Sequence, residues 1–176
     1  RVHSAGAKFD YEKAKWFNHE WIKKLSAERL MPDVKNILEQ KGIQIADDAV
    51  LKTVIDLVKD RCSLLTDFYD QASYFFKTPD NIDLSPIQPK WTDAKTTFFK
   101  EWANKLSSTN FADAHSMEES FKELAASMQL KPGEVMMPFR IMLVGGKFGP
   151  HVFDIAHLIG KEETIKRINA VLGMLG

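Results

Sequence analysis

The chain has 176 residues, of which 44% are hydrophobic and 27% charged, with 24 basic and 24 acidic side chains. This length suits one domain or two small ones with a buried core, and the composition is that of an ordinary globular protein. No apolar run reaches the roughly 18 residues of a membrane-spanning helix, and a single cysteine, Cys62, excludes an internal disulfide or a thiolate metal cluster. With no signal-peptide pattern, these features predict a cytoplasmic protein without membrane contact.

The balanced total charge conceals an uneven distribution along the chain. Residues 1–29 carry 7 basic and 4 acidic side chains, residues 30–130 carry 11 and 16, and residues 131–176 carry 6 and 4. A net charge of zero is uncommon for a nucleic-acid-binding domain. The two basic ends still permit an RNA-facing surface, and ordinary solvated charge explains the same pattern equally well.

Hydrophobic periodicity predicts an all-α protein, because no segment alternates between apolar and polar residues with a period of two. Capping residues, glycines and prolines set the expected ends of the helices. The expected helices run approximately over residues 12–25, 32–40, 48–60, 67–73, 93–106, 116–128, 138–144, 150–159 and 162–172. The apolar faces expected to point inward include Ala14, Phe17, Trp21 and Leu25, then Leu51, Val54, Ile55 and Val58, then Phe98, Trp102 and Leu106, then Met117, Phe121, Leu124, Ala125 and Met128.

A change of composition between residues 76 and 91 marks the predicted domain boundary. Pro79, Pro86 and Pro89 interrupt a polar segment that is too irregular for a helix. We therefore expect two small helical bundles in tandem. The first covers residues 1–88, with an extended N-terminal connector, and the second covers residues 89–176.

Trp16 falls outside the apolar arc of the first predicted helix and lies beside Lys13 and Lys23. Such a group can contact a sugar-phosphate backbone, because lysines neutralise phosphates and an indole offers a stacking plane. Helical spacing by itself favours the alternative, in which Trp16 packs on a neighbouring helix.

Arg61 occupies a tight corner between two predicted helices. A guanidinium held there would present a fixed fork of donors to a base edge or a phosphate. From the corner alone, the simpler interpretation is a helix cap or a salt bridge to Asp60 or Asp67.

Three short helices joined by glycine turns are predicted between Met137 and Asn169. Pro138 lies in the first turn of the first helix, Gly145-Gly146 ends it, and Gly149-Pro150 opens the second. A glycine turn brings backbone N–H and C=O groups to the surface beside a helix start, where they can bind a polar partner.

No catalytic or metal-binding constellation can be assembled from the sequence. The glycines at residues 145–150 follow a helix rather than a strand, and they lack the spacing of a dinucleotide fingerprint or a P-loop. Cys62, the serines and the five histidines have neither the spacing of a nucleophile with its base nor that of metal ligands. We expect no catalytic residue, metal or cofactor in this chain.

Three stretches, far apart along the chain, carry a family resemblance. They are residues 9–19, Phe-Asp-Tyr-Glu-Lys-Ala-Lys-Trp-Phe-Asn-His; residues 60–65, Asp-Arg-Cys-Ser-Leu-Leu; and residues 137–169, with Met-Pro-Phe-Arg, a Gly-Pro turn and Leu-Ile-Gly-Lys-Glu-Glu. In this order they resemble the C-terminal anticodon-binding region of bacterial glutamyl-tRNA synthetases, which are class I aminoacyl-tRNA synthetases. The two ATP-binding signature motifs of that family do not occur here, so the resemblance is to the part that follows the catalytic domain.

The resemblance implies recognition of the anticodon of glutamate tRNA, tRNA(Glu). Arg61 matches an arginine that reads the third anticodon base, and Arg140 matches an arginine near the first and second bases. Gly149, Pro150 and Val152 match a turn that touches the same two bases. The two arginines and the turn are therefore expected to address one set of three unstacked nucleotides.

Lys13 and Trp16 match positions that contact the tRNA body, and for Trp16 this outweighs the packing alternative. Residues 147–149, Lys-Phe-Gly, depart from other members of the family, so the resemblance assigns no side-chain contact there.

The resemblance also implies a role for the parent protein. The parent would be a glutamate–tRNA ligase that glutamylates tRNA with ATP, and glutamate, ATP and Mg would bind only in the missing N-terminal domain. The chain itself would be a non-catalytic monomer that binds tRNA(Glu) and not DNA. The alternative, from a different class, is a helical protein-interaction scaffold in which Arg61, Arg140 and the Gly-Pro turn serve only packing.

Overall fold

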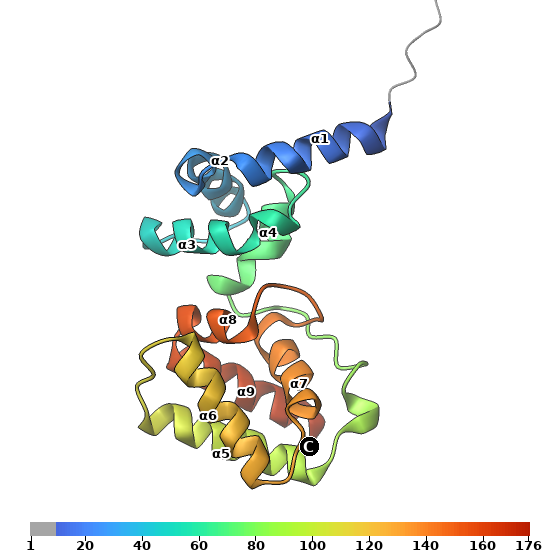
Figure 1. The fold of residues 1–176 in the computed structure, drawn as a ribbon, viewed down its shortest axis with the longest axis vertical. Helices are drawn as coiled ribbons and strands as arrows, with labels where there is room; N and C mark the ends of the chain where they lie inside the picture. The colour runs from blue at the N-terminus through green and yellow to red at the C-terminus, as the bar shows by residue number, and fades with distance from the viewer. Residues whose placement is uncertain (1–9) are drawn as a thin grey trace, which may run out of the picture. The chain divides into compact units, whose positions relative to one another are not determined.

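The computed structural model of this protein describes residues 10–176, and all secondary structure within them is helical (Figure 1). The predicted all-α class is confirmed, and the predicted connector over residues 1–8 lies outside the described residues. The first elements are α1 (Tyr11–Lys24), α2 (Ala27–Gln40), α3 (Asp48–Val58), the 3-10 turn η1 (Lys59–Arg61) and α4 (Asp67–Ala72). They are followed by η2 (Ser73–Phe75), η3 (Gln88–Lys90), α5 (Asp93–Ser108), α6 (Ala114–Ser127), α7 (Pro132–Val144), α8 (Val152–Ile159) and α9 (Lys161–Leu175). Among these helices, none combines the length and the apolar character needed to cross a membrane.

The chain forms two compact helical units, the first ending at Gln71 and the second beginning at Ala72. The division falls earlier than the one predicted between residues 88 and 89. The prolines predicted a linker, whereas residues 73–90 pack within the second unit.

Two hydrogen bonds show how the proline-rich segment is held in the second unit. The amide of Asp83 donates to the carbonyl oxygen of Gly145 at 2.9 Å, and the hydroxyl of Thr78 donates to the carboxylate of Glu163. Several prolines in a short segment disfavour a helix there, because each lacks a backbone donor and its ring crowds the preceding turn. They do not prevent their neighbours from bonding to a folded body.

The core of the first unit lies between α2 and α3. The predicted face of α3 is fully buried, and α2 packs its own apolar face on it. α2 begins five residues before the predicted start at Pro32, because Ser26 caps it with a side-chain oxygen that accepts from Arg29 N at 3.3 Å. Pro32 therefore lies inside this helix. The buried residues of α2 are Ala27, Leu30, Val34 and Leu38.

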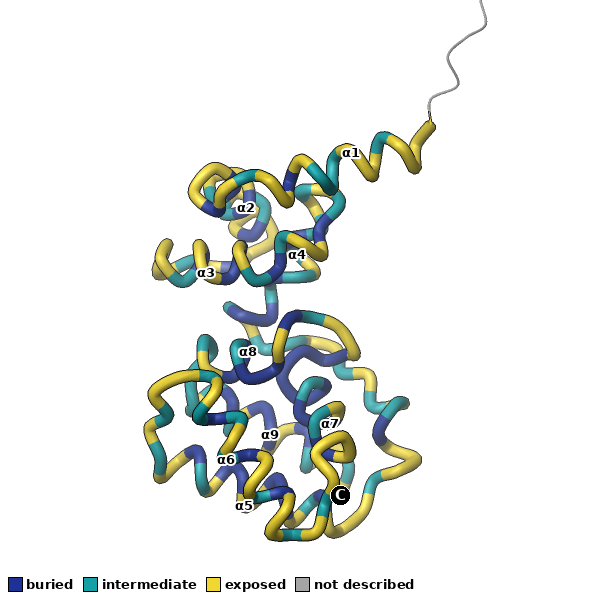
Figure 2. Tube along the Cα trace, in the orientation of Figure 1, coloured by how far each residue is buried: buried dark blue, intermediate teal, exposed yellow. Residues whose placement is uncertain are grey.

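The expected inward face of α1 is wrong. Phe17 and Trp21 are 57% and 52% exposed, and Ile22 is the buried residue of this helix. Most of α1 is exposed or intermediate (Figure 2). Helical spacing shows which residues share a face, but it does not show which face meets the core.

An aromatic cluster forms the core of the second unit. Phe121, on α6, has ring centroids 5.0–5.2 Å from those of Phe98, Trp102, Phe139 and Phe153. All five rings are 0% exposed. The predicted inward stripes of α5 and α6 are thus largely confirmed, although Leu124 and Met128 are only half-buried.

α7 differs from its predicted extent at its N-terminus. It begins at Pro132, so Pro138 lies inside the helix rather than in its first turn. Its predicted end is confirmed, because Gly145 caps it with a left-handed φ of 85°. The next two helices also begin and end close to the predicted residues.

Candidate nucleic-acid interface

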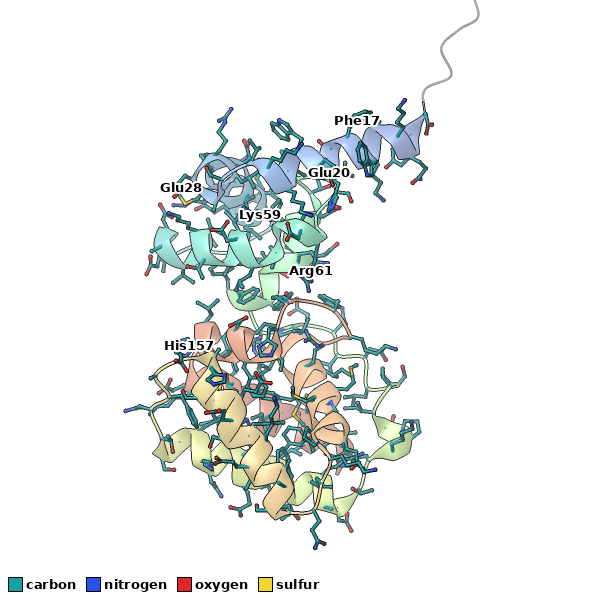
Figure 3. All side chains as sticks on the ribbon, viewed as in Figure 1. Phe17, Glu20, Glu28, Lys59, Arg61 and His157 are labelled. Atoms are coloured by element: carbon teal, nitrogen blue, oxygen red, sulfur yellow. The ribbon has the colours of Figure 1, made fainter. Side chains whose placement is uncertain are left out.

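Arg61 is the last residue of the 3-10 turn η1, between α3 and α4, and its side chain is exposed (Figure 3). Among the described residues it forms neither of the salt bridges to Asp60 or Asp67 that the corner suggested. The Asp67 carboxylate instead accepts hydrogen bonds from the amides of Ser63 and Leu64, at 2.8 and 2.9 Å. The loop after Arg61 is therefore fixed from α4 while the guanidinium faces solvent.

α1 holds the same loop from its other side. The Asn18 side-chain amide donates to Ser63 O at 2.5 Å, and Nδ1 of His19 lies 2.9 Å from Cys62 O, which requires a proton on Nδ1. Spacing along the sequence gave no signal for these contacts, because they join residues more than 40 positions apart. They fix the backbone that carries Arg61.

Cys62 supports this loop from inside the unit. Burial raises the pKa of its thiol to about 12, with the nearby Asp67 carboxylate adding to the effect. The thiol therefore stays protonated at neutral pH, and Sγ lies 3.5 Å from Val58 O. Cys62 is a packing residue rather than a nucleophile.

Arg140, on α7, holds the glycine-proline turn of the second unit. Its Nη1 lies 3.0, 3.1 and 2.6 Å from the carbonyl oxygens of Phe148, Gly149 and Pro150. The predicted Arg140, Gly149 and Pro150 thus come together in one small structure. The sequence did not show that the charge of Arg140 is directed at the backbone of the turn.

The turn leaves Phe148 exposed and Gly149 partly exposed, while the side chains of Pro150 and Val152 are buried. Gly149 and Arg140 are half-buried, whereas Pro150 is buried and Val152 is 2% exposed. The side chain of Val152 therefore belongs to the core of the unit. Gly149 has a φ of 97°, and a Cβ there would lie 2.8 Å from the hydroxyl oxygen of Tyr74, so the turn requires glycine at this position.

The end of α7 is anchored by a second arginine that the sequence did not single out. Arg167, on α9, is 2% exposed and donates to Leu143 O at 2.5 Å from Nη1 and to the Glu163 carboxylate at 2.8 Å from Nε. Gly145, the first residue after α7, packs against the backbone of Asn81. The backbone between the end of α7 and the glycine-proline turn is therefore attached to α9 and to the proline-rich segment.

Gly145→Ala is expected to destabilise the protein more than Gly42→Ala. Both glycines have a positive φ, of 85° and 81°, so either alanine costs about 1–2 kcal/mol in backbone energy. A Cβ at Gly145 would also overlap the carbonyl oxygen of Asn81, whereas nothing lies within 4 Å of one at Gly42. Urea unfolding of both variants measures the difference, and equal losses would contradict this account of the turn.

On α1, the residues predicted to contact the tRNA body are exposed. Lys13 is exposed, and Trp16 is 57% exposed, with its ring centroid 5.1 Å from that of Phe17 in an edge-to-face contact. Phe17, which is labelled in Figure 3, is 57% exposed as well. Trp16 also lines a small pocket with Glu12, Lys15, His19 and Ser63. Among residues 10–176, no cluster of side chains has the composition of a metal site.

The two tandem helical units place the chain in an all-helical class, and comparison with known proteins gives its family. The family model described as "Anticodon binding domain" matches residues 11–172. The chain belongs to this family of anticodon-binding domains.

Relatives of known sequence and structure agree with this assignment. Glutamate–tRNA ligases of Flavobacterium johnsoniae and Christiangramia forsetii are 36% and 37% identical to the chain over 175 residues, 99% of its length. A crystal structure of a glutamate tRNA ligase from Elizabethkingia meningosepticum, in complex with its amino acid, matches 99% of the chain with a TM-score of 0.88 and 36% identity. Glutamate-tRNA synthetase from Elizabethkingia anophelis matches 98% with a TM-score of 0.81 and 37% identity. The chain spans about a third of the length of these relatives.

Proposed function

We propose that this chain recognises the anticodon of tRNA(Glu) as part of a glutamate–tRNA ligase that acts in the cytoplasm. The observation that carries the proposal is the family match over residues 11–172, together with glutamate–tRNA ligases that are 36–37% identical across 99% of the chain. Because the chain spans about a third of those relatives, glutamate, ATP and Mg are assigned to the rest of the parent enzyme, where the ligation would occur.

In this proposal Arg61 reads the third anticodon base. Its guanidinium is exposed on a short 3-10 turn, and the adjoining loop is hydrogen-bonded from both α1 and α4. An exposed guanidinium on a fixed backbone can form a charge-assisted or bidentate contact with a base edge. Such a contact contributes about 1–3 kcal/mol of discrimination between bases.

The turn at Gly149 and Pro150 is assigned to the first and second anticodon bases. Arg140 supports this role by directing Nη1 at three consecutive carbonyl groups, which fixes the backbone that the bases would meet. Val152, whose side chain is buried, contributes from beneath by packing. Lys13 and Trp16 are assigned to the tRNA body, where a lysine neutralises phosphate and an exposed indole stacks or donates its N–H.

A binding titration with transcribed tRNA(Glu) tests the proposal. Changing the third anticodon base should weaken binding by about 5-fold to 150-fold, the equivalent of one lost base contact. Arg61→Gln should abolish this preference. Arg29→Gln is the matched control, because Arg29 is also exposed in the first unit but lies on α2, outside the Arg61 loop; this variant removes the same charge and should keep the preference.

Two outcomes would contradict the proposal in different ways. If Arg61→Gln and the base change both leave binding unaltered, Arg61 does not read the third base. If the chain binds tRNA(Glu) no better than an unrelated tRNA at each salt concentration, the scaffold alternative replaces anticodon recognition. A salt series is needed, because phosphate contacts alone give binding that falls steeply with salt and ignores sequence.

A further inference from the structure

Phe148 is the exposed aromatic ring of the glycine-proline turn. It is 42% exposed, whereas the phenylalanines of the core of the same unit, such as Phe139 and Phe153, are 0% exposed. An exposed phenyl ring beside a functional turn requires a physical explanation, because it leaves apolar surface in water.

The position of this ring is restrained from two sides. A Cβ on Gly146 would lie 2.8 and 3.0 Å from Cε1 and Cδ1 of the Phe148 ring, so the ring lies directly against a glycine backbone. Its edge also meets Tyr74, with ring centroids 5.8 Å apart and planes at 70°. Tyr74 is 3% exposed and packs on Phe75, so it is a rigid support.

The backbone of Phe148 is restrained as well. Its carbonyl oxygen is 3.0 Å from Nη1 of Arg140, which also bonds the next two carbonyls of the turn. The neighbouring Lys147 is exposed and carries a positive charge. The turn thus presents a fixed apolar ring beside a cation, which is the combination that binds single-stranded nucleic acid by stacking and phosphate neutralisation.

We propose that Phe148 is a preorganised stacking platform for one unstacked base of the anticodon loop, in addition to the residues assigned above. This inference rests on the proposed function, because it names a further contact with the same anticodon. A restrained ring loses little conformational entropy when a base covers it, so the contact retains most of its favourable energy. Stacking does not depend on base identity, so Phe148 is expected to increase affinity rather than to select a base.

Substitutions at Phe148 and Gly146 test the platform. Phe148→Leu keeps an apolar side chain but removes the aromatic face, and it should weaken binding of tRNA(Glu) by about 5-fold to 150-fold. Phe148→Trp should bind as well as the unmodified chain. Gly146→Ala should also weaken binding, because its new Cβ would displace the Phe148 ring. Met174→Ala is the control, since Met174 is a 56% exposed apolar residue of the same unit at the end of α9.

Combining the Phe148→Leu variant with modified RNAs, as in a double-mutant cycle, identifies the stacked base. Anticodon stem-loops that lack the base at one anticodon position are titrated against the unmodified chain and Phe148→Leu. The loss caused by Phe148→Leu should vanish with the RNA that lacks the first or the second base, and persist with the RNA that lacks the third. Thermal unfolding of each variant confirms that the fold is intact at the temperature of the titration.

The possible failures can be told apart. If the chain prefers the correct third base but Phe148→Leu binds normally, or loses the same factor with every abasic RNA, the platform is wrong and the proposed function stands. If the unmodified chain shows no preference for tRNA(Glu), both are wrong. Phe148→Trp that binds as weakly as Phe148→Leu would also overturn the platform.

Discussion

Glu163→Ala is expected to lower the free energy of unfolding by about 3–5 kcal/mol, the typical loss when a buried charge is left without its partner. Arg167, its partner on α9, is 2% exposed and would keep a buried guanidinium without its carboxylate. The hydroxyl of Thr78 would also lose its acceptor. The loss should therefore affect both the end of α7 and the proline-rich segment. Urea unfolding followed by circular dichroism measures it.

Two control variants separate the unpaired charge from general damage. Arg167→Met keeps most of the buried volume, and it leaves Glu163 with Thr78 and with Lys166, 3.4 Å away. It should therefore cost less than Glu163→Ala. Lys166→Ala removes an exposed partner of the same carboxylate and should cost about 0–1 kcal/mol. If Glu163→Ala costs less than Arg167→Met, the unpaired buried guanidinium of Arg167 is not the cause of the loss.

The pH dependence of stability should change in the same variant. Burial acts to raise the pKa of Glu163, but hydrogen bonds from Thr78 and Arg167 outweigh it, so the pKa is lowered overall. A carboxyl group with a lowered folded pKa contributes stability above its unfolded pKa, and this contribution is lost as the pH falls through the folded pKa. Glu163→Ala should therefore show a smaller fall in stability on acidification than the unmodified chain.

Arg140→Met is expected to have the second largest effect, because it removes the charged donor shared by three carbonyl groups of the turn. One hydrogen bond to a charged group contributes about 1.5–3 kcal/mol, and three bonds to a single nitrogen are not additive, so we expect a loss of about 2–4 kcal/mol in unfolding free energy. If the turn contacts the anticodon, tRNA(Glu) binding should also fall by about tenfold or more.

The conservative variant Arg140→Lys makes this prediction sharper. A lysine keeps the charge and one donor group at the end of a flexible chain, but it lacks the planar guanidinium. It should recover part of the stability and less of the binding, because binding depends on the position of the turn. Equal binding by Arg140→Met and the unmodified chain would show that the turn does not need this support for recognition.

Local signals in the sequence determined the class of the protein and much of its secondary structure. Asp47 and Thr92 cap α3 and α5 close to the predicted starts of these helices, and Gly145 ends α7 as predicted. These signals succeed because a cap or a left-handed glycine acts within one turn of its own backbone. The three stretches of sequence also showed the family resemblance without the structure. The family match confirms this resemblance.

Only the tertiary structure decided which groups each element meets. The contacts of Asn18 with Ser63 and of Thr78 with Glu163 join residues far apart in sequence, and no periodicity could show them. For the same reason the inward face predicted for α1 is wrong. Local propensity constrains backbone angles and shared faces, but the partner of a face, and the use of Arg140 to hold a turn, arise only when distant segments pack together.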